Sequence, residues 1–399
     1  MQPLSPVAGV RLAAVEAGIR KAARKDLVLF ELAPGSRVSG VFTRNAFCAA
    51  PVVVAREHLA AAAPRYWLVN TGNANAGTGA TGLQAAQQSC AVLAAVAGCS
   101  STEVLPFSTG VIGEPLPVER ITSALPALVD KLGEANWHDA AHGILTTDTV
   151  AKGATRQIEI GGQTVTLTGI AKGSGMIRPD MATMLAFIAT DAAVSQSLLD
   201  AALRDAVDHS FNRITVDGDT STNDACMVVA TGQSRAPLME RMDDPGYQGL
   251  CEALTAICTE LAQAIVRDGE GATKFITITV NGGRTQDESL AVAWAVAGSP
   301  LVKTAFFASD PNWGRILAAV GRAGIVGLDL ERVTIDLGEV RIVSGGGRAA
   351  DYTEARGQTV MARSEIPITI DLGRGDHSER VWTCDFSYDY VKINAEYRT

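Results

Sequence analysis

Apolar and polar residues recur along this chain with two different periods, which predict where strands and helices lie. Short runs rich in β-branched and aromatic residues predict strands at 27–32, 38–42 and 66–69. Residues 156–160 and 163–167 alternate around Gly161-Gly162, a pattern typical of a β-hairpin. Apolar residues spaced three and four apart predict helices over 83–96, 118–132, 196–207 and 250–266.

The pattern becomes richer in strands after Phe275. Strands are expected at 275–280, 290–296, 332–337, 339–343 and 367–372, with one helix at 315–323. The chain is therefore expected to be a mixed α/β protein of the α+β type, with a C-terminal α/β portion from residue 281.

Composition and charge narrow the class of protein. The 399 residues are 47% hydrophobic and 19% charged, too apolar for a disordered chain. The net charge is −9 and basic residues do not cluster, so nucleic acid is not expected as a partner. No apolar run reaches the ~18 residues of a membrane span, and the first residues do not resemble a signal peptide. We therefore expect a cytoplasmic protein without a membrane partner.

Cysteine and histidine give little support for metal chemistry. The seven cysteines are scattered without a CxxC pair, which favours reduced, buried thiols (Cys48, Cys90, Cys99, Cys226, Cys251, Cys258, Cys384). His138 and His142 have helical i, i+4 spacing, but no Glu follows the first His as in zinc proteases. No metal site is expected.

Four clusters combine glycine with Asn, Thr, Ser or Asp. They occupy residues 70–79, 172–179, 217–224 and 268–274. Glycine allows tight turns and close approach of the backbone, and the short polar side chains supply hydrogen bonds. One such loop is an ordinary surface turn, but four between apolar elements suggest loops that meet at a polar pocket. None matches a phosphate-binding fingerprint.

The residues leave several nucleophiles open. No GxSxG motif is present, although this does not exclude a Ser-His-Asp triad. Cys226 follows a polar loop, but its apolar neighbours favour a strand residue. A hydroxyl activated by a group other than histidine is the remaining candidate, and Thr183 stands where a polar loop becomes an apolar run. On the residues alone, a threonine at the start of a strand is the simpler interpretation of Thr183.

The segment Lys172-Gly-Ser-Gly-Met-Ile-x-Pro-x-Met-Ala-Thr-Met-Leu resembles the signature of the ornithine acetyltransferase family, the glutamate N-acetyltransferases of arginine biosynthesis. The resemblance extends in order over almost the whole chain. Thr71 and Ala225 depart from the residues common in that family, but neither is an expected site residue. The other matching motifs are residues 70–76, 108–113, 146–149, 219–224, 268–274, 310–315 and 393–399.

The resemblance implies a layered sheet–helix sandwich of the N-terminal-nucleophile type and a chain that cuts itself between Ala182 and Thr183. The products would be an α chain of residues 1–182 and a β chain of residues 183–399. Residues 183–280 would complete the catalytic core, and residues 281–399 would form the smaller C-terminal portion. Cleavage gives Thr183 a free α-amino group, which can act as general base near neutral pH.

The implied reaction moves an acetyl group from N2-acetyl-L-ornithine to L-glutamate through an acetyl-threonine intermediate on Thr183. The resemblance assigns Thr109 and Gly110 to the oxyanion hole. It assigns substrate contacts to Thr146, Lys172, Thr183, Glu270, Asn394 and Thr399. The C-terminal tail is expected to be ordered and to fold back over the pocket. No cofactor is implied, and the expected partners are the chain's own fragments, as a heterotetramer of two α and two β chains.

Two alternatives stay open beside this transferase. An N-terminal-threonine amidase or aminopeptidase would use water as the acceptor in place of glutamate. A binding or assembly protein without catalysis would remain uncut. Some family members also use acetyl-CoA as a donor, and no residue here distinguishes them from those that do not.

Overall fold

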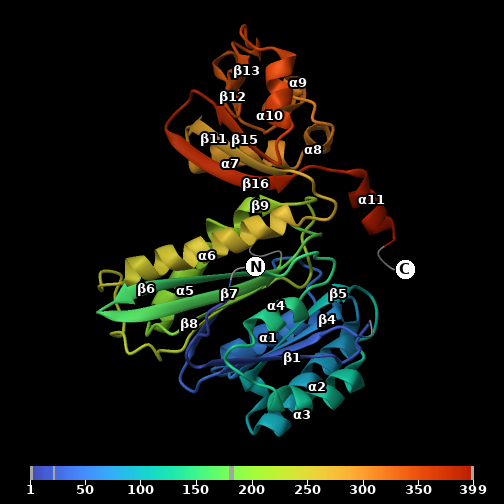
Figure 1. Cartoon of the computed structure of the whole chain (residues 1–399), viewed down its shortest axis with the longest axis vertical. Helices are drawn as coiled ribbons and strands as arrows, with labels where there is room; N and C mark the ends of the chain where they lie inside the picture. Colours follow the sequence, from blue (N-terminus) through green and yellow to red (C-terminus); the bar gives the residue numbers. More distant parts are fainter. Residues whose placement is uncertain (1–2, 21–22, 179–183, 397–399) are drawn as a thin grey trace. The chain divides into compact units, whose positions relative to one another are not determined.

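The chain divides into two compact units, each described here by itself (Figure 1). The computed structural model describes residues 3–20, 23–178 and 184–396. The first unit comprises Met1–Asn212 and Asp219–Ile265, and the second comprises Arg213–Gly218 and Val266–Thr399. The second unit thus begins before residue 281, because the strand β11 (Phe275–Gly283) lies inside its sheet.

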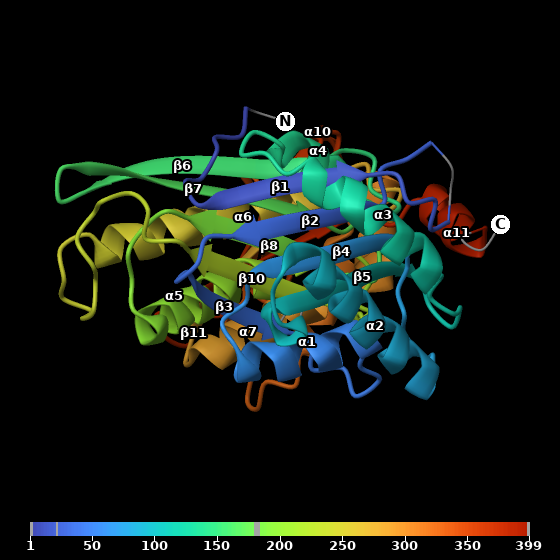
Figure 2. The same ribbon diagram turned by 90° about the horizontal axis from the view of Figure 1, so that it is seen from below.

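The first unit contains two β-sheets (Figure 2). The four-stranded sheet has the order β1-β2-β4-β5, in which only the last pair is parallel. The five-stranded sheet has the order β3-β10-β8-β7-β6, in which only β10 and β8 are parallel. The strands are β1 (Val10–Val15), β2 (Leu27–Leu32), β3 (Arg37–Phe42), β4 (Tyr66–Asn73), β5 (Val104–Val111), β6 (Lys152–Ile160), β7 (Gln163–Lys172), β8 (Leu185–Thr190) and β10 (Ala225–Ala230).

Aromatic side chains hold the two sheets face to face. Phe187 on β8 lies 5.0 Å from Phe30 on β2, 5.7 Å from Trp67 on β4 and 5.1 Å from Phe107 on β5, measured between ring centroids. All four rings are buried in one apolar cluster with residues of both sheets. Aromatic pairs at these distances add to the burial of apolar area. The contact between Phe107 and Phe187 fixes β5 opposite β8.

Helices cover the outer faces of both sheets. A second apolar cluster packs α2 and α3 against the four-stranded sheet, while α6 packs against β7 of the other sheet. A Cβ atom at Gly169 would lie 3.1 Å from Ile257 Cγ2 on α6, so glycine permits this close packing. By length and composition α6 could cross a membrane, but half of that stretch is buried inside the protein. The helices are α1 (Ala50–Ala61), α2 (Gly79–Ala97), α3 (Val118–Asp130), α4 (Trp137–Gly143), α5 (Gln196–Asp208) and α6 (Tyr247–Arg267).

The second unit is one seven-stranded sheet with helices and its own apolar core. Its strand order is β14-β13-β12-β15-β11-β16-β9. The strands besides β11 are β9 (Ile214–Thr215), β12 (Thr334–Leu337), β13 (Val340–Ser344), β14 (Gly347–Arg348), β15 (Glu365–Asp371) and β16 (His377–Cys384). The helices are α7 (Gln286–Ala297), α8 (Pro300–Phe307), α9 (Trp313–Gly321), α10 (Glu354–Met361) and α11 (Tyr388–Ala395).

Most predicted elements are present, and one is wrong. The hairpin at Gly161-Gly162 joins β6 and β7 as expected. Residues 290–296, predicted as a strand, belong to α7. Valine, tryptophan and alanine fill this segment so completely that both a two-residue and a helical period fit it. The cap decides, because Thr285 Oγ1 accepts a hydrogen bond from Glu288 N and begins the helix.

Candidate active site

The expected oxyanion residues lie where β4 and β5 end side by side. The parallel register places Thr109 beside Thr71 and Gly110 beside Gly72. Gly110 has φ +135°, and a Cβ atom there would lie 2.3 Å from the carbonyl carbon of Gly72. Glycine is therefore required at 110 both by its backbone conformation and by the neighbouring chain. Thr109 beside it is buried.

Hydrogen bonds of buried polar side chains fix the end of β5 at residues 108–110, here named the oxyanion turn. Ser108 Oγ donates to Asn70 Oδ1 at 2.5 Å, and Asn70 Nδ2 donates to Asn73 O at 2.9 Å. Asn73 Nδ2 in turn donates to Glu114 O and Pro115 O. These hydrogen bonds make the ends of β4 and β5 rigid, because each broken bond would leave a buried polar atom without a partner.

The expected cleavage site precedes a central strand of the five-stranded sheet. Ala182 and Thr183 lie outside the described residues, but Met184 and Leu185 follow them directly and are buried. Leu185 begins β8 and pairs with Lys172 at the end of β7 and with Ala225 at the start of β10. Ala225 N also donates to Met184 O at 2.9 Å. The end of β7 and the start of β10 therefore flank the first residues after Thr183.

Two of the expected substrate contacts are brought together beside this strand. Lys172 Nζ donates to Thr146 Oγ1 at 3.1 Å. Asp148 connects their two loops, because its Oδ1 accepts from Gly173 N at 2.7 Å and its Oδ2 from Thr146 N at 3.0 Å. Lys152 Nζ lies 2.7 Å from Asp148 Oδ1, and both side chains are buried. The Asp148–Lys152 ion pair thus holds the backbone of Thr146 and of Gly173, the residue after Lys172.

Two buried carboxyl groups in this region have opposite electrostatics. Burial disfavours the charged form of Asp148, but Lys152 and Lys172 outweigh it and lower the pKa to about 2. Burial raises the pKa of Asp224 well above its ordinary value, despite a hydrogen bond from Ser221 and the charge of Lys172. Within the described residues, Asp224 Oδ2 has no hydrogen-bond partner. The pKa of Asp148 is therefore lowered and the pKa of Asp224 is raised, although both carboxyl groups are buried.

Sequence reasoning did not single out Asp148, Lys152, Asn223 or Asp224 as site residues. Three of them stand in motifs that carried the family resemblance, at 146–149 and 219–224. That resemblance was the available signal, because a buried Asp or Asn cannot be distinguished from a loop residue in a single sequence. Lys152 had no such signal.

The second unit contains the other expected contacts. Asn394 Nδ2 on α11 donates to Glu270 Oε2 at 2.8 Å, which brings these two residues together. Glu270 is buried in the loop before β11, and Asp385 anchors that loop through Thr273 N at 2.8 Å and Lys274 N at 2.9 Å. Thr399 lies outside the described residues.

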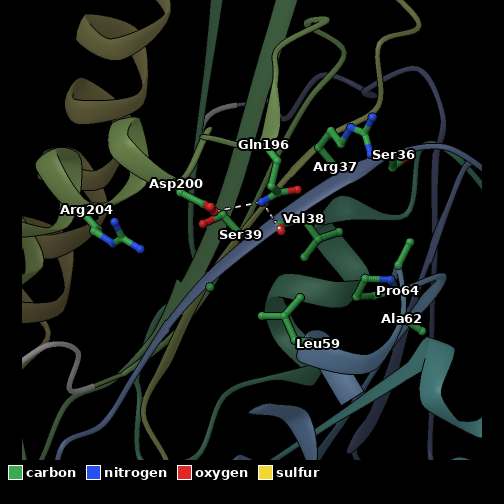
Figure 3. Close-up of a pocket in the computed structure, with 12 residues that line it drawn as sticks. Ser36, Arg37, Val38, Ser39, Leu59, Ala62, Pro64, Gln196, Asp200 and Arg204 are labelled. Atoms are coloured by element: carbon green, nitrogen blue, oxygen red, sulfur yellow. Dashed lines mark hydrogen bonds between the residues drawn. The ribbon is translucent and has the colours of Figure 1, made fainter. Parts of the chain in front are cut away.

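A separate cavity of about 370 Å³ lies at the edge strand β3 and involves none of the expected site residues (Figure 3). Gln196 Nε2 donates there to Val38 O and to Asp200 Oδ1, each at 2.9 Å. The glutamine covers a carbonyl of an edge strand, which protects that edge from pairing with another chain. His138 and His142 are exposed on α4, and no group of three possible metal ligands occurs within the described residues.

The fold is a layered α/β sandwich, as expected, and buried polar residues gather near the start of its central strand β8. A model of the ArgJ family matches residues 11–399. The chain belongs to the ArgJ family, and the resemblance inferred from its motifs is confirmed.

Relatives and a solved structure agree with this assignment. The chain is 58% identical over 396 residues to the arginine biosynthesis bifunctional protein ArgJ of Pseudomonas fluorescens (strain Pf0-1), covering 99% of this chain and 98% of the relative. The protein of that name from Pseudomonas syringae pv. tomato is also 58% identical, with the same coverage. The crystal structure of the arginine biosynthesis bifunctional protein ArgJ from Bacillus halodurans matches with a TM-score of 0.50 and 37% identity. It covers 53% of this chain and 98% of that chain.

Proposed function

We propose that this chain is a self-cleaving N-terminal-threonine acetyltransferase of arginine biosynthesis, which moves an acetyl group from N2-acetyl-L-ornithine to L-glutamate. The observation that carries the proposal is the surroundings of the start of β8. Lys172 pairs with Leu185 there, and the same lysine is hydrogen-bonded to Thr146. Lys172 and Thr146, to which we assign substrate contacts, thus lie beside Leu185, which follows Thr183 by two positions.

Self-cleavage begins with attack of the Thr183 hydroxyl on the carbonyl carbon of Ala182. The peptide bond becomes an ester as the Thr183 nitrogen takes up a proton, and water then hydrolyses the ester. The match to the Bacillus halodurans structure supports a two-chain product. That solved chain corresponds to 53% of this chain, close to the share of residues 183–399.

Transfer uses the amine that cleavage releases. An α-amino group has an ordinary pKa of about 7.7–8.0, so part of it is unprotonated near neutral pH and can accept the hydroxyl proton of Thr183. The hydroxyl attacks the acetyl carbonyl, ornithine leaves with the proton, and the acetyl-threonine passes its acetyl group to the amine of glutamate. Thr109 and Gly110 stabilise the oxyanion in both steps.

Charge complementarity supports the assignment of the substrate contacts. Lys172 can pair with the α-carboxylate that both amino acids carry, and Thr146 holds its ammonium group. We assign Glu270 to the amino end of ornithine and keep Asn394 and Thr399 as further contacts. The relatives are named bifunctional, which supports acetyl-CoA as a second donor in this chain. A cytoplasmic heterotetramer of two α and two β chains completes the proposal, without a resident cofactor.

Intact mass under denaturing conditions tests the cleavage. The parent is expected to give fragments 1–182 and 183–399, and Thr183→Ala a single uncut chain. Thr183→Ser keeps a hydroxyl and is the matched control, which should still cut. An uncut parent chain would rule out the N-terminal-threonine mechanism.

Glutamate dependence tests the reaction. Acetylornithine should be consumed only when L-glutamate is present, and N-acetylglutamate should form in equal amount. Release of acetate without glutamate would favour the amidase hypothesis instead. A cut protein with neither activity would overturn both.

A further inference from the structure

Asn223 connects the two sheets of the first unit. It is buried in the loop that leads into β10, a strand of the five-stranded sheet. Its Nδ2 donates to Ala74 O at 2.6 Å and to Ser108 O at 2.9 Å, and both acceptors belong to the four-stranded side. Its Oδ1 accepts from Thr222 Oγ1 at 2.6 Å. Both N–H groups of the amide are therefore used on the opposite sheet.

The acceptor Ser108 is next to the oxyanion residue Thr109. Its backbone carbonyl is held by Asn223 and its hydroxyl by Asn70, so the residue before the turn is fixed from two directions. The turn itself has little freedom, because Gly110 lies against the backbone of Gly72. Because the turn is rigid and Ser108 is hydrogen-bonded to Asn223, a displacement of Asn223 would displace the whole turn.

What holds Ser108 is the loop beside the strand that follows Thr183. Ala225 pairs with Leu185 in parallel register. Asn223 stands two residues before Ala225, as Thr183 stands two residues before Leu185. The side chain of Asn223 thus ties the oxyanion turn to the end of the sheet at which β8 begins.

We propose that Asn223 is a positioning residue, which holds the Thr109–Gly110 turn in place relative to the start of β8 at Leu185. It acts through Ser108 and does not touch the substrate. Oxyanion stabilisation depends on donors that are already in place, and a displacement of about 1 Å can cost about 10²-fold in rate. The inference rests on the proposed function, because it assumes chemistry at Thr183.

The amide is the side chain that this position requires. A carboxylate would place oxygen against two carbonyl oxygens in a buried site, and alanine would leave both carbonyls without their donor. Asn136 provides a matched control in the same unit. Its Nδ2 also donates to two backbone carbonyls, Leu12 O at 2.8 Å and Lys131 O at 3.1 Å, and neither acceptor belongs to β4 or β5.

The test compares Asn223→Ala, Asn223→Asp and Asn136→Ala with the parent, using kcat, KM for both substrates, melting temperature and the rate of self-cleavage. We expect both Asn223 variants to lose about 10²-fold in kcat with KM nearly unchanged, because the oxyanion forms only in the transition state. Asn136→Ala should keep kcat even where its melting temperature falls. If the Asn223 variants are folded but cut themselves much more slowly than the parent, that result supports the same role, because self-cleavage also passes through an oxyanion.

A double-mutant cycle with Thr109→Ala separates positioning from general damage. If Asn223 acts through the turn, the double variant should be about as slow as the slower single variant. Additive losses, or an Asn223→Ala variant that keeps the parent kcat, would overturn the inference. A parent without acetyl transfer would instead overturn the proposed function.

Discussion

Asp148 and Lys152 form a buried ion pair, with 2.7 Å between Oδ1 and Nζ, and Asp148 also accepts a hydrogen bond from Thr146 N, one of the expected substrate contacts. The carboxylate also accepts hydrogen bonds from Thr146 N, Thr146 Oγ1 and Gly173 N. The pair is therefore a support for Thr146 and Lys172 and not only a link between neighbours in sequence.

Removing both members of the pair should cost less than the sum of the two single removals. Asp148→Asn leaves the charge of Lys152 buried without this carboxylate, and Lys152→Met does the reverse, so each should lower the free energy of unfolding by about 3–5 kcal/mol. The double variant should lose less than the sum of the two. Denaturant unfolding of the three variants measures this, and strictly additive losses would contradict the coupling.

The raised pKa of Asp224 predicts a stability that falls as pH rises. The unfolded chain releases this proton near pH 4, whereas the folded chain keeps it to higher pH, so above pH 4 each pH unit costs up to about 1.4 kcal/mol until the folded group ionises. Asp224→Asn cannot ionise. Its unfolding free energy should therefore change less between pH 4 and pH 8 than that of the parent. Parallel curves would show that Asp224 is ionised in the folded chain.

Gly110 and Gly113 separate backbone conformation from close contact. Both have positive φ, +135° and +84°, but a Cβ atom at 113 would meet nothing within 4 Å. Gly113→Ala should cost about 1–2 kcal/mol of stability for its backbone conformation alone. Gly110→Ala should cost more and should also reduce kcat, because the 2.3 Å contact with Gly72 forces the turn to move. Equal effects in thermal melting and turnover would contradict this.

Deleting residues 394–399 should reduce acetyl transfer without unfolding the chain. None of the residues of α11 is buried, so the loss of Asn394 and Ala395 removes little packing, but it removes the 2.8 Å hydrogen bond from Asn394 to Glu270. Melting curves recorded beside turnover test this. Lys392→Ala, an exposed change on the same helix, is the control and should leave both unchanged. A large loss of melting temperature on deletion would assign the tail a structural role instead.

Local patterns predicted much of the secondary structure. The strand at Leu27–Leu32 and the hairpin at Gly161-Gly162 follow from two-residue alternation and turn glycines, which act within a few residues. The segment 290–296 was misread because its composition is apolar at nearly every position and carries no period of its own. There the decision came from a cap outside the segment.

The sequence by itself determined the family, through collinear motifs. The family resemblance in turn led us to expect Thr183 as the nucleophile, Gly110 in the oxyanion hole, and Thr146 and Lys172 as substrate contacts. Only the tertiary structure showed that Asn223 reaches Ser108, 115 positions away, and that the Asp148–Lys152 pair supports Thr146 and the residue after Lys172. The physical reason is range. Propensity and periodicity act between near neighbours, whereas the Asn223 amide finds its acceptors on the other sheet and Asp148 accepts from Gly173 N, 25 positions away.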